Sequence, residues 1–283
     1  MITVDNFFRE YKSNILKEGE AITFAHKKSV DSTSAHSLHL NNHIEIFFFI
    51  NGNADYIVEN ACFSLKPGDV VLIRPNQVHK AVIKTSALYE RFYILIPTNA
   101  LYPLSPNPTD KLLGGTGALL SLDDNTKKQI SQLLYKTEEA FLEDSTGLLP
   151  FSLITQLIYY IGGALPLTAT STAASLPPVI KDIFAFIDRR LTTIVGVSDV
   201  AEEFHLSLPY ISALFKEHTG IAMNAYIRAR KIAHAKKLLD AGQTVTYACY
   251  ESGFGDCSYF IKCFKNQTGM TPHKYQKSKL QQA

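Results

Sequence analysis

The sequence predicts an α+β protein in two parts: an N-terminal β-barrel with flanking helices, then an all-α part with two helix-turn-helix units. Strand-sized apolar segments separated by turn signals run from about residue 28 to residue 96. Apolar residues at helical spacing dominate from residue 122 onward. A chain of 283 residues is long enough for two ordinary domains, each with its own core.

The strand predictions begin at residues 43–50, which read HIEIFFFI. Both faces of this segment are largely apolar, which is typical of a barrel or a sandwich whose sheets are covered on both sides. Asn51-Gly52 is a hairpin signal, and further turn signals separate predicted strands at residues 54–59, 62–65, 70–74 and from residue 79. The residues before about 28 show no clear period, so no element is predicted there.

Two helices are predicted between the strands and the C-terminal part. Residues 101–117 have the composition of a loop, residues 122–143 and 151–161 follow a helical period, and Gly162-Gly163 is expected to end the second helix. Residues 166–178 (PLTATSTAASLPP) have the composition of an interdomain linker. The predicted division is therefore a domain at 1–165, a linker at 166–178 and a second domain at 179–283.

The clearest motif is GFGDCSYFIKCFK at residues 253–265. Gly253 supplies the positive φ of a sharp turn after a helix at residues 245–252, and Asp256 is a plausible N-cap for the next helix. Phe260 and Phe264 share one face of that helix, which leaves a basic face outward. The pattern predicts a helix-turn-helix whose second helix enters a DNA major groove.

A second unit of this kind is predicted upstream, with helices at residues 198–206 and 207–219 and a closing Gly220. Between the units, residues 223–239 predict a helix with a solvated stripe of Arg228, Lys231, Lys236 and Lys237. The segments YISALFKEHTG, IRARKIAHAKKLL and ESGFGDCSYFIKCFKNQTGMTPHKY, with their spacing, resemble the AraC/XylS transcription regulators. The resemblance covers about the last 105 residues and implies two DNA-reading heads in successive major grooves, about 34 Å apart.

The resemblance, together with the outward helix faces, implies a set of DNA-binding residues. In the first head these are Ser207, Pro209, Tyr210, Ser212, Ala213 and Lys216, and in the second Cys257, Ser258, Ile261, Lys262 and Lys265. Long side chains that could bond a base edge in a bidentate manner are scarce, and Lys262 is the best candidate for a guanine or phosphate contact. We expect weak specificity from each head, offset by two heads per chain and two chains per site.

The charge distribution agrees with this assignment. Residues 1–177 hold 14 Lys and Arg against 17 Asp and Glu, whereas residues 178–283 hold 14 against 9. The basic half coincides with the two helix-turn-helix units, so binding to DNA phosphates should weaken steeply with salt.

In the N-terminal half, HLNNHIEIFFFING followed by LKPGDVVLIRPNQVH resembles the cupin-like sensor barrel of many AraC-type regulators. His39, Glu45 and His79 stand where cupin metal ligands would be, but Asn41 occupies a histidine position, so no metal and no cofactor are expected. The predicted role is instead to bind a small effector, with a sugar as the best guess. The candidate effector-binding residues are His39, His43, Glu45, Phe47, His79 and Tyr93.

Alternative interpretations of the barrel remain open at this stage. Its polar residues could simply fill the interior, the barrel could serve only for dimerisation, or the chain could be a cupin metalloenzyme with a DNA-binding appendage. The resemblance implies a homodimer that is not an enzyme, has DNA and RNA polymerase as partners, and activates transcription as the more common outcome.

Two further expectations concern the compartment and the cysteines. The first residues lack the order of a secretory signal and no apolar run reaches about 18 residues, so a cytoplasmic protein is expected. The four cysteines include no C-x-x-C pair and are expected to be buried, reduced thiols. Cys257 is the exception, because it lies at the start of the second recognition helix, although the sequence identifies no resolving partner for it.

Overall fold

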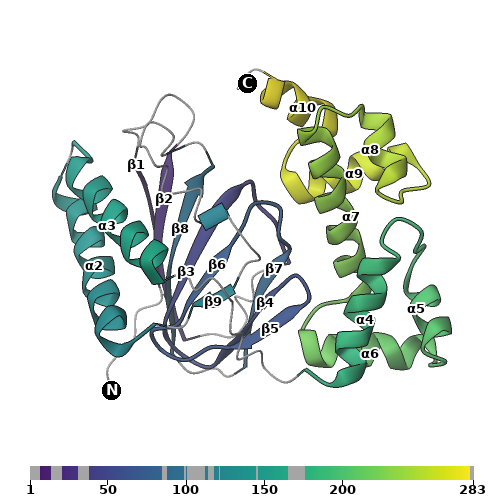
Figure 1. Ribbon diagram of the computed structural model, residues 1–283, viewed down its shortest axis with the longest axis horizontal. Helices are drawn as coiled ribbons and strands as arrows, with labels where there is room; N and C mark the ends of the chain where they lie inside the picture. Colours follow the sequence, from purple (N-terminus) through teal and green to yellow (C-terminus); the bar gives the residue numbers. More distant parts are fainter. Residues whose placement is uncertain are drawn as a thin grey trace.

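The computed structural model describes residues 7–13, 21–30, 38–84, 88–98, 100, 112–113, 118–120, 122–144, 146–164 and 176–280. A sheet-rich N-terminal part lies between a pair of helices and a helical C-terminal part (Figure 1). The predicted α+β class is confirmed. Most of the predicted loop at 101–117 and of the predicted linker at 166–178 lies outside the described residues.

In the described part of the chain, nine strands form two antiparallel sheets. The larger has the order β1 (Phe7–Ser13), β2 (Ile22–Ser29), β8 (Tyr89–Pro97), β3 (His43–Asn51), β6 (Val70–Ile73) and β9 (Ala118–Leu120). The smaller has the order β5 (Ala61–Ser64), β4 (Ala54–Val58) and β7 (His79–Ile83). Among the described residues no continuous ladder joins the two sheets, so the expected barrel takes the form of two facing sheets (Figure 1).

The period of two in β3 decides what each face of the larger sheet contacts. Ile44, Ile46 and Phe48 pack in the core beneath the helices, whereas Phe47 and Phe49 pack against the smaller sheet. Both sets are essentially inaccessible to solvent. The double-faced apolar strand predicted from the sequence is therefore confirmed, and its odd-numbered residues face the interior between the sheets.

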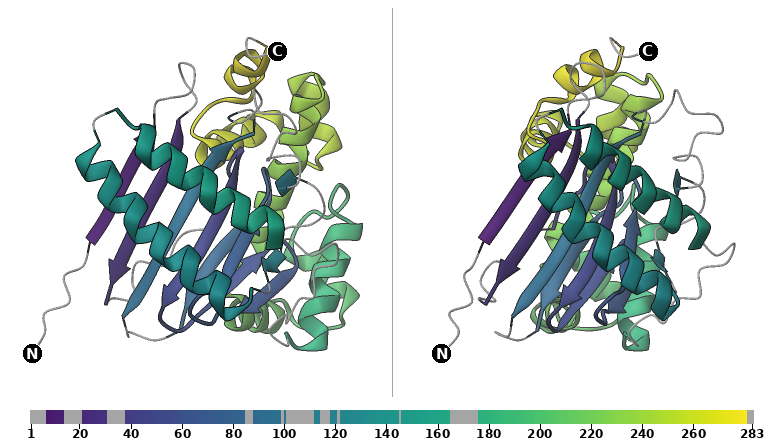
Figure 2. Two further views of the ribbon diagram at one scale, coloured as in Figure 1. Left: turned by 60° about the vertical axis from the view of Figure 1, so that its left-hand side comes forward. Right: turned by 90° about the vertical axis from the view of Figure 1, so that its left-hand side faces the viewer.

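Helices α2 (Asp124–Glu143) and α3 (Leu148–Ala164) cover the outer face of the larger sheet (Figure 2). Asp123 caps α2 by accepting a hydrogen bond from the Thr126 amide at 2.9 Å. The predicted end of α3 was wrong, because the helix continues through Gly162 and Gly163. Neither glycine has a positive φ, so both keep a backbone compatible with the helix.

The C-terminal part contains seven helices among the described residues. They are α4 (Pro178–Arg189), α5 (Val197–Glu203), α6 (Leu208–Thr219), α7 (Met223–Asp240), α8 (Val245–Glu251), α9 (Cys257–Thr268) and α10 (Pro272–Leu280). Their core extends into the N-terminal part, where Leu40, Ile57, Cys62 and Val78 belong to the same apolar cluster. The two parts are thus packed together in this structure.

Two predictions about individual segments fail for identifiable reasons. The segment without a clear period includes β1 and β2, whose burial depends on pairing with the distant β8. On α7, Lys231 and Lys236 are buried rather than solvated. Their ammonium groups reach backbone or side-chain oxygens while their stems pack in the core, a behaviour that helical spacing alone does not predict.

No helix of the described chain is long and apolar enough to span a membrane.

Candidate functional site

The turn between α8 and α9 is fixed by close packing at Gly253. Its φ is +81°, and a Cβ at this position would lie 2.6 Å from the Thr192 carbonyl oxygen. The Lys231 ammonium donates to the Gly253 carbonyl at 2.7 Å and to the Ile194 carbonyl at 2.6 Å. The turn glycine predicted from the sequence therefore positions α9 against the segment between α4 and α5.

Helix α9 presents one face to the core and the other to solvent. The Asp256 carboxylate accepts a hydrogen bond from the Tyr259 amide at 2.6 Å, which confirms the predicted N-cap. Phe260 and Phe264 are fully buried. Of the five predicted contact residues, Ser258, Ile261, Lys262 and Lys265 are exposed and Cys257 is half-buried.

Helix α6 has the same construction. The Ser207 hydroxyl accepts from the Tyr210 amide at 3.4 Å, and Ile211 and Phe215 are fully buried. The predicted contact residues Ser207, Pro209, Tyr210, Ala213 and Lys216 are exposed, and Ser212 is half-buried.

The turn before α6 differs from the one before α9. His205 adopts a φ of +52° where the second unit has a glycine. This left-handed conformation costs a residue with a Cβ roughly 1–2 kcal/mol, so the first turn is the more strained of the two.

Several exposed apolar side chains join this surface without having been predicted. Leu208 lies between the contact residues Ser207 and Pro209, and Tyr247 and Tyr250 lie on α8, the first helix of the second unit. About half of each of these side chains is exposed. The sequence could have indicated them, because each is a large apolar residue that lies outside the apolar stripe of a short helix.

A polar cluster occupies the interior between the two sheets. One ligand-type atom from each of His39, Glu45 and His79 lies within 4.8 Å of the others. The Glu45 carboxylate bonds His79 Nε2 at 3.1 Å, and it accepts from the Tyr56 hydroxyl at 3.2 Å and from the Asn41 amide at 3.0 Å. The structure thus brings together three of the six predicted effector-binding residues.

The charge of this cluster is stabilised internally. Burial acts to raise the pKa of Glu45, but the charges of His79, His39 and Arg91 and the hydrogen bond from His79 outweigh it and lower this pKa to about 2. Two imidazoles and a carboxylate could in principle hold a transition metal. However, His79 Nε2 already bonds Glu45 and both Glu45 oxygens have protein donors, so the residues fit a hydrogen-bonded network better than a metal site.

Aromatic rings flank the polar cluster. The Phe47 ring lies 4.4 Å from the Tyr56 ring, and Tyr93 is opposite Phe47 in the β3–β8 register. The Arg91 guanidinium, which sequence reasoning missed, lies 5.5 Å from the Phe47 ring and 5.4 Å from the Tyr93 ring. An arginine inside a largely apolar strand was the available signal for it. His43 is half-buried at the start of β3, outside the group formed by His39, Glu45 and His79.

Residues 38–42 and β7 form a ribbon between this cluster and the C-terminal helices. His39 and His79 pair as an isolated antiparallel bridge, with their rings 4.1 Å apart on the inner side. On the outer side, Leu40 packs in the helical core. The Leu38 carbonyl accepts from Gln267 at the end of α9 at 3.4 Å.

The same ribbon reaches the end of α6 and the middle of α7. The Lys80 ammonium donates to the Gly220 carbonyl at 2.5 Å, at the C-terminal end of α6. The Lys236 ammonium donates to the Asn42 side chain. Both recognition helices are therefore held at their C-terminal ends by the N-terminal part, whereas their N-terminal turns are exposed.

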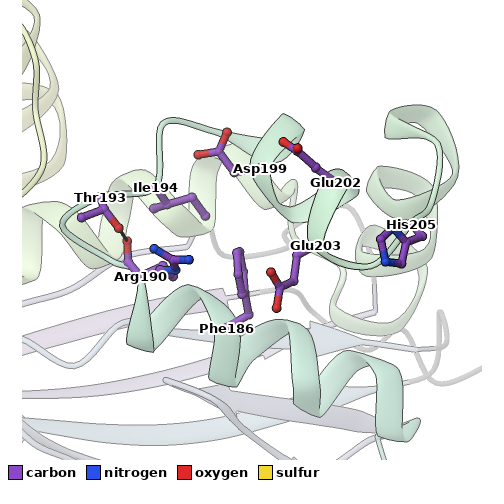
Figure 3. A pocket seen from close by; sticks show the side chains of 8 residues that line it. All are labelled: Phe186, Arg190, Thr193, Ile194, Asp199, Glu202, Glu203 and His205. Carbon is purple, nitrogen blue, oxygen red and sulfur yellow. Dashed lines mark hydrogen bonds between the residues drawn. The ribbon is translucent and has the colours of Figure 1, made fainter.

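An open groove of about 630 Å³ lies beside the first unit (Figure 3). Phe186 of α4 and Arg190, the residue after the end of α4, face Asp199, Glu202 and Glu203 of α5 across it. Three carboxylates against one guanidinium make the groove acidic, so it repels phosphates and does not belong to a nucleic-acid surface.

Comparison with known proteins follows the same division of the chain. A helix-turn-helix domain family matches residues 200–278. The HTH-type transcriptional activator RhaS of Enterobacter sp. (strain 638) is 23% identical over 252 residues, which cover 83% of this chain and 86% of RhaS. The multiple antibiotic resistance protein MarA of Escherichia coli (strain K12) is 29% identical over 103 residues, which cover 36% of this chain and 81% of MarA.

Among solved structures, ToxT from Vibrio cholerae O395 is 16% identical and is matched over 90% of this chain and 96% of its own, with a TM-score of 0.36, too low to support a structural argument. The family match covers both recognition helices, and the match to RhaS extends over the sheets as well. With two capped helices that expose their first turns, the chain is a DNA-binding transcription regulator that resembles the AraC/XylS regulators.

Proposed function

We propose that this regulator is a sequence-specific activator that places α6 and α9 in successive major grooves of one operator. The observation that carries the proposal is the shared construction of the two helices, each with a side-chain N-cap, a buried apolar face and an exposed first turn. Short side chains such as Ser212 and Ala213 favour close approach and contact with thymine methyl groups. The name of RhaS, a transcriptional activator, supports activation over repression.

The test is operator binding by the full chain and by Lys262→Ala. An operator is first selected from random duplexes, and its affinity is then measured at several salt concentrations. Because Lys262 is exposed on the contact face of α9, we expect a loss of affinity and a salt slope smaller by about 1. Lys128→Ala on the distant α2 is the matched control and should change neither quantity. An unchanged affinity and slope in Lys262→Ala would remove α9 from the interface.

We further propose that the interior between the sheets responds to a small effector. A polar cluster with ordered donors and acceptors, flanked by Phe47, Tyr56 and Tyr93, is the composition of a site that orients a small polar ligand such as a sugar. A ligand that binds only the native state raises the melting temperature, so the full chain should be scanned against sugars and sugar acids. A stabilising hit must be weakened in Glu45→Gln and retained in Glu138→Gln, a buried carboxylate on the other face of the larger sheet.

The division of the chain and its other partners are also proposals. We infer an effector and dimerisation domain at 1–165, a linker at 166–178 and a DNA-binding domain at 179–283. Leu142, Leu149 and Tyr159, which are exposed on α2 and α3, support pairing with a second copy through these helices. An activator needs RNA polymerase as a partner and access to the chromosome in the cytoplasm. The polar groups of the cluster around Glu45 hydrogen-bond one another, which supports a regulator that is not an enzyme.

A further inference from the structure

The inner face of the larger sheet carries two cations directly opposite each other. In the β2–β8 ladder Lys27 pairs with Arg91, and further along β2 Ser29 pairs with Tyr89. Alternate residues of a strand share a face, so the four side chains lie together. The Arg91 guanidinium lies 5.9 Å from the Tyr89 ring, and Tyr89 belongs to the apolar cluster between the sheets. The group therefore faces the interior in which an effector is proposed to bind.

The pairing of Lys27 with Arg91 is electrostatically unfavourable. Like charges directly opposite each other in a ladder repel, and here Arg91 is 5% exposed and Lys27 is half-buried. Burial lowers the pKa of Lys27, and the positive charge of Arg91 lowers it further. An anion between the two side chains would reverse this effect, because it attracts both of them.

The carboxylates on the same face of the sheet have other donors. Glu10 of β1 pairs with the Lys12 ammonium at 3.7 Å. Glu45 of β3 accepts from the Tyr56 hydroxyl and bonds His79 Nε2. Within the described residues, Lys27 forms no ion pair with either of them.

A buried hydroxyl adjoins the two cations. Ser29 is 6% exposed, and in the described part of the chain its Oγ has no hydrogen-bond partner. Burying a hydroxyl without a partner is unfavourable, so a native structure rarely retains one without a reason. An oxygen of a bound anion would accept a hydrogen bond from Ser29 while it neutralises the charges of Lys27 and Arg91.

A carboxylate suits these side chains better than a phosphate does. The planar guanidinium of Arg91 can donate two parallel hydrogen bonds to the two oxygens of a carboxylate, and Lys27 adds a point charge. The Glu45 carboxylate, whose pKa is lowered to about 2, stays ionised on the same face. A doubly charged phosphate would bring more negative charge near it than a carboxylate would.

Aromatic rings connect the two cations to the Glu45 cluster. Successive pairs on this face of the β3–β8 ladder are Phe49 with Arg91, Phe47 with Tyr93, and Glu45 with Leu95. Cationic donors thus lie at one end of an aromatic row, and a carboxylate acceptor lies at the other. A molecule that matches this row has a carboxylate, a flat or apolar body, and a hydroxyl or amine donor at its far end.

We propose that Lys27, Arg91 and Ser29 form an anion site, and that the effector is a small organic acid whose carboxylate binds there. The role of this acid as an effector rests on the proposed function, whereas its binding at the site does not. A sugar acid should therefore bind more tightly than the corresponding neutral sugar.

The first measurement is the melting temperature of the full chain with matched pairs of compounds. Each pair is an acid and its neutral counterpart: galacturonate with galactose, phenylacetate with phenylacetamide, and butyrate with butyramide. Ionic strength is kept equal so that screening does not differ, and inorganic phosphate is added as a second kind of anion. A ligand that binds only the native state raises the melting temperature. We expect at least one acid to do so and its neutral counterpart to bind about tenfold more weakly or worse.

The second measurement is the Kd of the stabilising acid for three variants, by isothermal titration calorimetry. Lys27→Met keeps the apolar stem and removes the charge, so it should weaken the acid about tenfold and bring its affinity close to that of the neutral counterpart. Ser29→Ala removes only the hydroxyl and should also weaken the acid. Lys28→Met is the matched control, because Lys28 is the next residue of β2, lies on the other face and pairs with Glu90 at 3.5 Å. It should bind the acid like the wild type.

The outcomes separate the anion site from the effector role. A neutral compound that binds as tightly as its acid, or an acid that binds Lys27→Met as tightly as the wild type, overturns the anion site and leaves the effector proposal intact. Stabilisation by inorganic phosphate alone overturns the carboxylate class, and stabilisation by none of these compounds overturns the site. An acid that binds through Lys27 but leaves operator affinity unchanged supports the site and rejects the effector role.

Discussion

Gly253→Ala is the substitution that most directly tests how the second head is built. The φ of +81° is unfavourable for alanine, and the new methyl group would lie 2.6 Å from the Thr192 carbonyl oxygen. That oxygen is part of the backbone and cannot turn away as a flexible side chain could. The turn must therefore open, and α9 must move with it.

The magnitude can be estimated from two costs and one gain. The left-handed conformation costs alanine roughly 1–2 kcal/mol, and forcing a methyl group into a filled site costs typically about 1–3 kcal/mol. The lower entropy of the unfolded alanine chain returns about 0.4–1 kcal/mol. The expected loss in free energy of unfolding is thus about 1–5 kcal/mol.

Gly242→Ala is the matched control for this experiment. Gly242 has a φ of +80°, nearly the same, but nothing lies within 4 Å of where its Cβ would be. It should lose only the conformational part, about 1 kcal/mol. Urea denaturation gives both values from the shift in midpoint at an unchanged m value. Equal losses in the two variants would refute the argument that contact with Thr192 fixes the turn.

Three further predictions concern charge and surface. Glu45 has a pKa of about 2 in the folded chain against an ordinary 4.5. Its contribution of about 3 kcal/mol to the free energy of unfolding is therefore present above pH 4.5 and is lost as the pH falls toward 2. In a series of urea midpoints measured against pH, Glu45→Gln should flatten this part of the curve. Lys231→Met leaves the Ile194 and Gly253 carbonyls without their donor and should cost about 2 kcal/mol in urea denaturation. Tyr159→Ser should weaken self-association in sedimentation velocity and leave operator affinity per chain unchanged, because α3 lies far from the recognition helices in Figure 1.

The helix-turn-helix units were predictable because their determinants are local. Asp256 caps α9 through an amide three residues away, and Gly253 forms the turn within the same short segment. The double-faced pattern of β3 was also visible, since its alternation needs only neighbouring residues. Each of these features follows from short-range geometry and from the solvent preference of single side chains.

The features that sequence reasoning missed depend on distant partners. β1 and β2 lack a clear apolar period because β2 is buried by pairing with β8, and among the described strands β1 pairs with β2 alone. The helical position of Lys231 predicts a solvated side chain, but its ammonium donates to two carbonyls that belong to other segments.

The ribbon of residues 38–42 and β7 shows how the interior between the sheets and the two DNA-reading heads can be linked without large movements of whole helices or strands. Because successive side chains of an extended segment point to opposite sides, His39 and His79 lie beside Glu45 while the Lys80 side chain reaches the end of α6. The Leu38 backbone carbonyl accepts from Gln267 at the end of α9. A ligand that moves the inner side chains must also move the outer ones, since they share one backbone. The contacts at Gly220 and Gln267 are single hydrogen bonds, each worth about 1 kcal/mol, so an effector needs only a modest difference in affinity to change how the two heads are held.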